Sequence, residues 1–333
     1  LKVLAKLNPT ERRHPQDGQF STKVDEQRLD IRLATAESIH GETAVLRLLN
    51  RAGSLLSLPD LGFAPGTLER HQRMLRHPFG MVLIAGPTGA GKTTTLYASL
   101  GQLDRAERNI VTIEDPVEYR FEGITQLQVS QRHGISFATG LRAIMRMDPD
   151  VIMVGEIRDG ETAQIAVQAA LTGHLVLSSI HANDAAGAIF RLLNLGADTF
   201  MVSAALLGVV AQRMVRKVCP YCAKEQEADA ESQALFAEVL QEQRSVFKQG
   251  AGCSMCTGTG YRGRTGIFEL LETSETLEEM LLARAPAAEI RRQAIAKGMV
   301  TMLQDGMRKA AEGVTTPAEV VRHVYSAAGS RRT

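Results

Sequence analysis

A short apolar run followed by a glycine-rich loop is the strongest constraint on what this chain can fold into. Residues 81–85 are apolar, residues 86–93 match the pattern G-x-x-x-x-G-K-[ST], and residues 95–100 are compatible with a helix. Glycines allow backbone N–H groups to curl around phosphate oxygens, and a helix that starts near Lys92 directs its positive dipole end at the same anion. The order strand, loop, helix therefore predicts a P-loop in an α/β domain, and this context disfavours an incidental glycine-rich turn.

The side chains at the end of this loop have distinct predicted roles. Lys92 is expected to reach the β- and γ-phosphates of a nucleoside triphosphate, and the Thr93 hydroxyl is expected to ligate Mg²⁺. The predicted nucleotide-binding residues are Gly86, Pro87, Thr88, Gly89, Ala90, Gly91, Lys92, Thr93 and Thr94.

Acidic residues follow two later apolar runs. Residues 110–113 lead into Glu114 and Asp115, and residues 151–154 lead into Glu156. Because ligands bind outside the carboxyl ends of strands in open α/β sheets, these carboxylates are expected to face the phosphates or Mg²⁺. Glu156 matches the Walker-B arrangement, and its length favours polarising a water over ligating the ion, so we interpret it as the general base. An acidic turn without a chemical role is the alternative for both.

Two histidines flank the predicted strand 175–180. His181 falls at its carboxyl end, on the expected active edge, whereas His174 falls at the opposite end. From the residues alone, a role for His181 in sensing the γ-phosphate and a structural role are equally supported.

The N-terminal part of the chain has its own pattern. Residues 16–21 predict a hairpin turn, and residues 29–35 and 44–49 predict strands. Arg32 and Arg47 each interrupt an apolar run. Taken alone, this pattern favours strand arginines that are turned to solvent.

All four cysteines occur in two C-x-x-C pairs, after residues 206–218, which we expect to be a helix that is basic at its end. A polar, helix-compatible insert over residues 228–248 separates the pairs. The pattern predicts a structural Zn²⁺ site, with a redox pair as the alternative. The predicted zinc ligands are Cys219, Cys222, Cys253 and Cys256.

The C-terminal part of the chain, residues 276–325, predicts a series of helices.

The bulk composition narrows the class of protein. A length of 333 residues suits about two domains, and a net charge of +1 argues against a surface that tracks nucleic acid. The chain lacks an initiator Met, so we expect a fragment of something longer. Neither a membrane span nor a disulfide scaffold is indicated, which favours a reducing, cytoplasmic compartment.

Together the motifs resemble the ATPases of type II secretion systems and of type IV pilus assembly. The resemblance covers nearly the whole chain, and the tetracysteine insert is similar to the general secretion pathway E type and unlike the retraction ATPases of pili. The stretches that carry it are residues 86–97, 114–119, 141–159 and 172–183, with 260–267 after the insert.

The resemblance implies a RecA-like P-loop ATPase domain preceded by the end of a small PAS-like α+β domain. The implied divisions are 1–57 for the PAS-like part with a linker to about 66, 67–214 for the ATPase core, 215–265 for the zinc subdomain and 266–333 for a helical C-terminal subdomain. The implied cofactors are ATP, Mg²⁺ and Zn²⁺.

The resemblance also implies a homo-hexamer, attached peripherally to the cytoplasmic face of the inner membrane. The implied partners are a membrane platform protein, met mainly through an N-terminal domain absent from this chain, and acidic phospholipid, with no nucleic acid.

The family's arginines extend the expected site. Arg32 and Arg47 match phosphate-contacting arginines of the smaller domain, which replaces the solvent-facing interpretation, and Arg146 and Arg158 match arginines of the motor domain. A further basic contact is doubtful, because Gln19 and Thr43 stand where relatives often carry a basic residue.

Three functions stay open at this point. The first is ATP hydrolysis that powers pseudopilus assembly and protein export, or the extension of a type IV pilus. The second is a nucleic-acid motor, which also uses a P-loop but is disfavoured by the near-neutral charge and the zinc insert. The third is a scaffold that binds nucleotide without hydrolysing it.

Overall fold

The computed structural model describes residues 1–24, 27–50, 56–130, 133–325. The chain forms two compact units, Leu1–Leu56 and Ser57–Thr333. Residues 51–55, near the end of the expected PAS-like part, lie outside the described residues, as does the end of the C-terminal tail.

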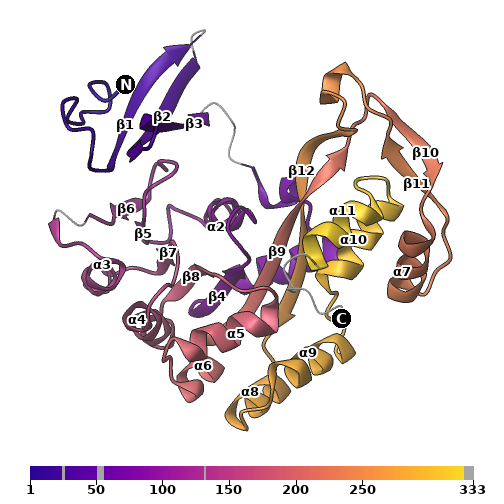
Figure 1. Ribbon diagram of the computed structural model, residues 1–333. Helices are drawn as coiled ribbons and strands as arrows, with labels where there is room; N and C mark the ends of the chain where they lie inside the picture. Colours follow the sequence, from indigo (N-terminus) through magenta and orange to yellow (C-terminus); the bar gives the residue numbers. More distant parts are fainter. Residues whose placement is uncertain (25–26, 51–55, 131–132, 326–333) are drawn as a thin grey trace. The chain divides into compact units, whose positions relative to one another are not determined.

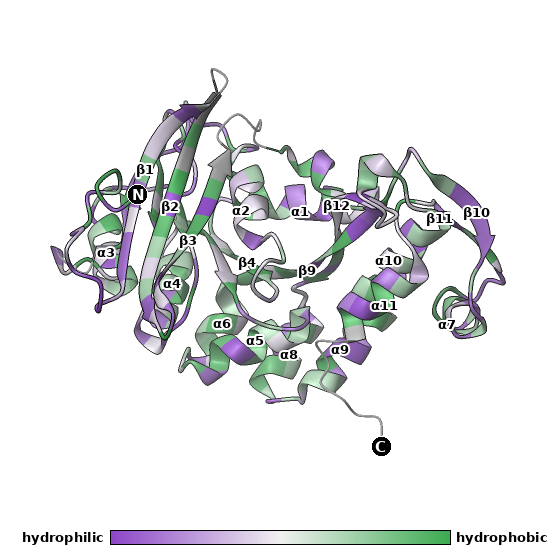
Figure 2. Ribbon diagram, turned by 45° about the horizontal axis from the view of Figure 1, so that its top comes forward, coloured by the Kyte–Doolittle hydropathy of each residue, from purple (hydrophilic) through white to green (hydrophobic). Residues whose placement is uncertain are grey.

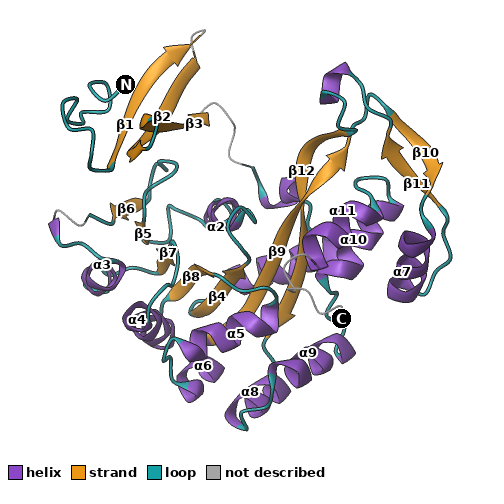
Figure 3. Ribbon diagram, viewed as in Figure 1, coloured by secondary structure: helices purple, strands orange, loops and turns teal. Residues whose placement is uncertain are grey.

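The first unit is a three-stranded antiparallel sheet in the order β1-β2-β3 (Figure 3). Its strands are β1 (Gln16–Val24), β2 (Gln27–Ser38) and β3 (Gly41–Asn50). The prediction of a hairpin turn at residues 16–21 was wrong, because this segment pairs residue by residue with β2, from Gln16 opposite Thr35 onward. Turn-forming residue types do not prevent a strand where a neighbouring strand satisfies the backbone hydrogen bonds.

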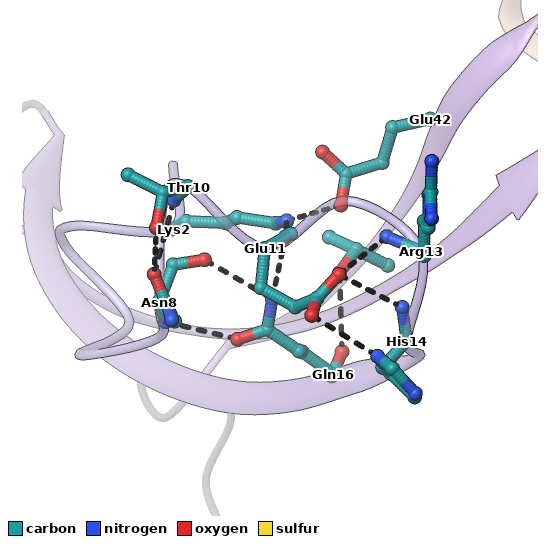
Figure 4. Close-up of polar contacts among 9 residues, drawn as sticks. Lys2, Asn8, Thr10, Glu11, Arg13, His14, Gln16 and Glu42 are labelled. Atoms are coloured by element: carbon teal, nitrogen blue, oxygen red, sulfur yellow. Dashed lines mark hydrogen bonds and ion pairs between the residues drawn. The ribbon is translucent and has the colours of Figure 1, made fainter.

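The segment before β1 is tied down by polar contacts, which Figure 4 shows. The Lys2 ammonium donates to the Glu11 carbonyl at 2.5 Å and forms an ion pair with Glu42. Gln16 bridges Asn8 and the Glu11 carbonyl through its side-chain amide. The loop thereby buries Ala5 and lies close against Gly18 of β1, which is opposite the buried Leu33 of β2.

The second unit is built on a seven-stranded sheet in the order β12-β9-β4-β8-β7-β5-β6 (Figure 1). All neighbours are parallel except β12, which runs antiparallel to β9. The strands are β4 (Gly80–Ala85), β5 (Ile110–Glu114), β6 (Thr125–Gln128), β7 (Val151–Val154), β8 (Leu175–Ile180), β9 (Leu206–Val218) and β12 (Tyr261–Glu272).

Helices cover both faces of this sheet, as continuous apolar strands require. Alternate residues of β4 show the division: Val82 and Ile84 pack toward α1 (Pro65–Leu75) and α2 (Lys92–Leu100), and the others pack toward the opposite layer. The opposite layer contains α3 (Phe137–Ile144), α4 (Gly160–Leu171), α5 (Ala185–Asn194) and α6 (Thr199–Ala205). A short 3-10 helix, η1 (Leu58–Leu61), precedes α1.

The prediction of a helix over residues 206–218 was wrong. Helix α6 ends at Ala205, and residues 206–218 form strand β9. The run is rich in Val and Leu and lies between β4 and β12, where both of its edges gain hydrogen-bonded partners. A short apolar run is compatible with a buried strand or a buried helix, and tertiary pairing decides between them.

The insert between the cysteine pairs consists of β10 (Ala223–Glu227), α7 (Ala230–Leu240) and β11 (Val246–Gly250), so the helix-compatible stretch is only partly helical. Figure 2 shows β10 as hydrophilic and α6 beside the main sheet as hydrophobic. The core of the insert is small and centres on Phe236 against Phe247, with ring centroids 5.1 Å apart.

The predicted series of C-terminal helices is confirmed. It consists of α8 (Glu275–Leu282), α9 (Ala287–Ala296), α10 (Met302–Ala311) and α11 (Pro317–Tyr325). Among the described residues, none of the helices has the length and apolarity that a membrane crossing requires.

Candidate active site

The loop between β4 and α2 has the backbone that a phosphate-binding loop requires. Gly89 and Gly91 have φ angles of +78° and +87°, a region in which other L-residues are strained. Gly91 is the N-cap of α2, so the free N–H groups and the positive dipole end of this helix are directed toward the loop. The segment is therefore preorganised to bind an anion.

Lys92 lies within this loop and is buried. Its Nζ donates to the carbonyls of Gly86 at 2.8 Å and Pro87 at 3.1 Å. Burial lowers the pKa of Lys92, while the nearby Glu156 carboxylate opposes that shift. The ammonium is desolvated, and its two partners are neutral carbonyl oxygens. An ion pair with a bound phosphate would therefore stabilise it.

Glu114 ends β5 and is almost completely buried. Its carboxylate accepts hydrogen bonds from Tyr97, from Thr112 at 2.6 Å and from Gln126 at 3.1 Å. The hydroxyl of Tyr97 in turn accepts a hydrogen bond from the Glu118 backbone N–H at 3.0 Å. Tyr97 thus connects the helix after the P-loop to the acidic segment after β5.

Glu156 follows β7 and lies among three cationic or titratable groups. It is paired with Arg158, and one of its oxygens is 3.5 Å from Nε2 of His181. Burial raises the pKa of Glu156, but the hydrogen bond and charge of Arg158, helped by His181 and Lys92, outweigh that effect, so the pKa lies below its usual value. Glu156 is therefore ionised at neutral pH and can accept a hydrogen bond from water.

His181 is half exposed and belongs to the same cluster. Burial and the charge of Lys92 lower its pKa, and the neighbouring Glu156 opposes the shift. The imidazole is consequently neutral at pH 7, which leaves one ring nitrogen as a donor and the other as an acceptor. His174 lies at the start of β8, where Nδ1 is 2.9 Å from the Ala169 carbonyl, a structural contact.

A cavity of about 60 Å³ brings Thr93 together with the carboxylates. Hydroxyl and carboxylate oxygens are the ligands that Mg²⁺ prefers, so the donor set fits the ion expected beside Thr93. The acidic lining residues are Glu114, Asp115, Glu118 and Glu156.

The structure places the predicted arginines in different surroundings. Arg158 lies in the cluster around Glu156. Its guanidinium forms an ion pair with Glu156 and is 3.8 Å from the Asp115 carboxylate. Arg146 is exposed after α3, and its Nη1 donates to the Arg142 carbonyl. Arg32 and Arg47 belong to the first unit, and their approach to a nucleotide stays a prediction.

The four cysteines meet although they come from two distant segments. Their sulfur atoms all lie within 4.8 Å of one another, and three of the sulfur pairs are 3.7 to 3.9 Å apart. A tetrahedral zinc site with Zn–S bonds of about 2.3 Å separates its sulfurs by about 3.8 Å, so the geometry fits Zn²⁺. Backbone N–H groups of Cys253 and Gly260 donate to Cys256 Sγ, which favours the thiolate that a metal needs.

Sequence reasoning missed four polar side chains that support the site, of which three are buried and one is partly buried. Their partners lie far along the chain, so no local pattern marks them. Only Tyr97 stood within a recognised motif, and its position two turns into a buried helix was the available signal. The missed residues are Tyr97, Gln126, Gln212 and Arg213.

The fold and the arrangement of the P-loop, the carboxylates and the cysteines define the class as a P-loop ATPase domain with a tetracysteine insert, which confirms the expected fold class. The family model described as Type II/IV secretion system protein matches residues 1–322. The chain belongs to this family.

Named relatives support that assignment. The chain is 46% identical over 322 residues to the Type II secretion system ATPase E of Vibrio cholerae, covering 97% of this chain and 64% of that protein. It is also 46% identical over 322 residues to the Type IV pilus assembly ATPase PilB of Thermus thermophilus, covering 96% and 36%. The chain thus spans less than two thirds of the length of these relatives.

Solved structures share the fold. The crystal structure of the pilus retraction motor PilT with bound ADP has a TM-score of 0.69 and 25% identity, covering 93% of this chain and 77% of that one. The ATPase DotB of Legionella pneumophila has a TM-score of 0.68 at 20% identity, covering 95% and 78%.

Proposed function

We propose that this chain is the motor part of a cytoplasmic ATPase that hydrolyses ATP to power pseudopilus assembly and protein export by a type II secretion system. The observation that carries the proposal is the cluster of Lys92, Glu156 and His181 at the carboxyl ends of three parallel strands. Family membership and the names of the relatives support ATP hydrolysis.

The reaction follows from the roles of these residues. Residues 86–94 hold the phosphates of ATP, with Lys92 on the β- and γ-phosphates. Glu156 accepts a hydrogen bond from the attacking water, orients it toward the γ-phosphorus and takes up its proton, while the bond from that phosphorus to the β–γ bridging oxygen breaks and ADP leaves. A strongly basic Glu156 is unnecessary, because the transition state of phosphoryl transfer is loose. His181, neutral and 3.5 Å from Glu156, reports on the γ-phosphate.

The metal and the arginines complete the site. Thr93 would hold Mg²⁺, with Glu114 positioning water or metal through the cavity that both line. When bound, Mg²⁺ neutralises charge that develops on the β- and γ-oxygens. Arg32 and Arg47 close from the first unit onto that charge, and Arg146 and Arg158 contact the phosphates from the motor side.

The assembly and its setting are part of the same proposal. The proposal keeps the domain divisions set out from the sequence and adds Zn²⁺ on the four cysteines as a structural metal that leaves no open coordination position. The protein acts as a homo-hexamer, attached peripherally to the inner membrane through a platform protein, with acidic phospholipid as a further partner and without nucleic acid.

Assembly of a type IV pilus is a second candidate. The observation that favours it is the equal identity, 46%, to the PilB relative. Both candidates use the same site and the same reaction. They differ in the machine that the motor drives, so expression in strains that lack either ATPase separates them by rescue of secretion or of pilus extension.

Phosphate release by the purified chain tests the central claim. Glu156→Gln should lower turnover by about 10²-fold or more while ATP affinity stays within a few-fold, because the neutral amide orients water poorly. Glu161→Gln, on an exposed carboxylate of α4 that pairs with Arg142, is the matched control and should leave turnover unchanged. Turnover of Glu156→Gln within a few-fold of the original would overturn the role of Glu156.

Added partners discriminate between the classes of function. Vesicles that contain acidic phospholipid should raise turnover, and single-stranded DNA should leave it unchanged. Stimulation by single-stranded DNA alone would favour a nucleic-acid motor instead. ATP binding without phosphate release, even at high protein concentration and with vesicles, would favour a nucleotide-gated scaffold.

A further inference from the structure

A buried glutamine on β9 contacts the P-loop from behind. Gln212 is only 1% exposed, and its Nε2 donates to the Ala90 carbonyl at 2.6 Å. Its Oε1 accepts a hydrogen bond from the Thr95 hydroxyl at 2.8 Å. One amide therefore joins the tip of the loop to the first turn of α2, the two parts that together supply the phosphate-binding N–H groups.

The glycines at the two ends of the loop also fit against this residue. A Cβ added to Gly86 would lie 2.7 Å from the Gln212 backbone oxygen. A Cβ added to Gly91 would lie 3.2 Å from Gln212 Nε2. Real Cβ atoms essentially never approach as closely as the first distance, so the loop rests on Gln212 because Gly86 has no side chain.

We propose that Gln212 is a positioning residue that holds the P-loop in its nucleotide-binding shape. The inference rests on the proposed function only in taking this loop as the ATP site. Gln212 touches no reacting atom in this scheme, and it acts through Ala90 and Thr95. A glutamine suits the position because one contact needs a donor and the other needs an acceptor.

The same requirement provides a sharp test. Gln212→Leu removes both contacts and leaves the Ala90 carbonyl without its donor. Gln212→Glu has the same shape, but the ionised carboxylate has no proton to give to Ala90. Burial raises the pKa of such a carboxyl, so lowering the pH restores a donor and an acceptor at the same two positions.

The experiment measures KM and kcat for ATP and the Kd of a non-hydrolysable ATP analogue with Mg²⁺, between pH 8.5 and 6. Gln212→Leu should raise KM and Kd by about tenfold or more, as the loss of a buried contact predicts. Gln212→Glu should show the same defect at pH 8.5 and recover most of it toward pH 6, whereas the original chain shows no such recovery. A merely structural role would not produce this pH-dependent rescue of affinity.

Val215→Ala is the matched control, because Val215 is fully buried three residues farther along β9 and its apolar side chain forms no hydrogen bond with the P-loop. It should lower the thermal midpoint and leave KM unchanged. Thr95→Val combined with Gln212→Leu should cost little more affinity than Gln212→Leu alone, since both act on one contact. KM and Kd within twofold of the original for both Gln212 variants would overturn the proposal.

Lys92→Ala separates this inference from the proposed function. If Lys92→Ala abolishes nucleotide binding while the Gln212 variants bind normally, the loop is the ATP site and only the role of Gln212 fails. If Lys92→Ala binds the analogue like the original chain, the loop is not the ATP site and both claims fail.

Discussion

Arg32 lies directly opposite Arg47 in the antiparallel pairing of β2 with β3. Side chains at opposed positions share one face of a sheet, with Cβ atoms about 4.5 to 5.5 Å apart, and like charges there are destabilising. Gln19 lies opposite Arg32 on the other side, so this register position holds two arginines and one neutral residue. A row of two guanidinium groups at adjacent positions is an arrangement suited to a phosphate.

Because the two arginines face each other, we predict that removing the charge of Arg47 increases stability but decreases activity. Arg47→Gln should raise the free energy of unfolding of the first unit by a few tenths of a kcal/mol at low salt, because the repulsion is relieved at an exposed position. The same change should lower turnover by about 10³-fold if Arg47 acts as an arginine finger. Urea unfolding and phosphate release measure the two effects. Arg13→Gln, an exposed arginine of the same unit, should change neither, and unaltered turnover for Arg47→Gln would exclude the finger role.

Tyr97 provides a second test, because its hydroxyl is the link between α2 and the acidic segment. Burial and the hydrogen bond to Glu114 raise the pKa of Tyr97, so the hydroxyl stays protonated and donates. Tyr97→Phe should destabilise the second unit by about 1–3 kcal/mol and lower turnover, since Glu114 loses one donor and the Glu118 N–H loses its acceptor. Tyr119→Phe, on the exposed ring that packs edge-on against Tyr97, is the matched control. Equal stability of the two variants would contradict this role.

His71 predicts how stability depends on pH. The side chain is fully buried, Nε2 is 2.8 Å from Ser99 Oγ, and within the described residues Nδ1 has no hydrogen-bond partner. Burial lowers the pKa of His71 to about 4 from its ordinary 6.5. As the pH falls, His71 therefore binds a proton in the unfolded chain before it does so in the folded chain. The contribution of neutral His71 to the free energy of unfolding is complete above pH 6.5 and is lost between pH 6.5 and 4. The loss amounts to about 3 kcal/mol in total.

Urea unfolding at pH 7.5 and pH 5 measures this loss. The original chain should lose about 2 kcal/mol between these values from His71 alone. His71→Gln retains a group that can bond Ser99 and has no proton to gain, so it should show a correspondingly smaller decrease. An identical decrease in both proteins would show that His71 does not control the acid sensitivity.

The cysteine cluster predicts one tightly held Zn²⁺ per chain. A thiol-modifying reagent in the presence of a colorimetric zinc indicator should release one equivalent, and Cys222→Ser should lower the zinc content and the thermal midpoint. The small core around Phe236 and Phe247 explains why the metal matters, since the two-stranded sheet of the insert buries little apolar surface. Ser254→Ala, within the short helical turn η3 (Ser254–Cys256), is the control. Full zinc content in Cys222→Ser would show that the cluster is not the ligand set.

Local sequence patterns predicted those parts of the site whose functional residues are adjacent or closely spaced in the chain. The P-loop could be recognised because glycines, Lys92 and the preceding apolar strand are contiguous, and the cysteine pairs because metal ligands recur at short spacing. The order of strands and acidic residues placed Glu114 and Glu156 at one sheet edge, since parallel strands end on the same side.

The tertiary structure decided what depends on partners that are distant in the chain. Residues 206–218 became β9 because β4 and β12 offer hydrogen bonds on both sides, which no periodicity within the run reveals. The contact of Gln212 with Ala90 joins residues 122 positions apart, and that of Tyr97 with Glu114 crosses from a helix to a strand. By itself the sequence determined which groups are available to bind phosphate and metal. Only the packed sheet decided which buried side chains hold those groups in place, because desolvated polar atoms must find their partners wherever the fold brings them together.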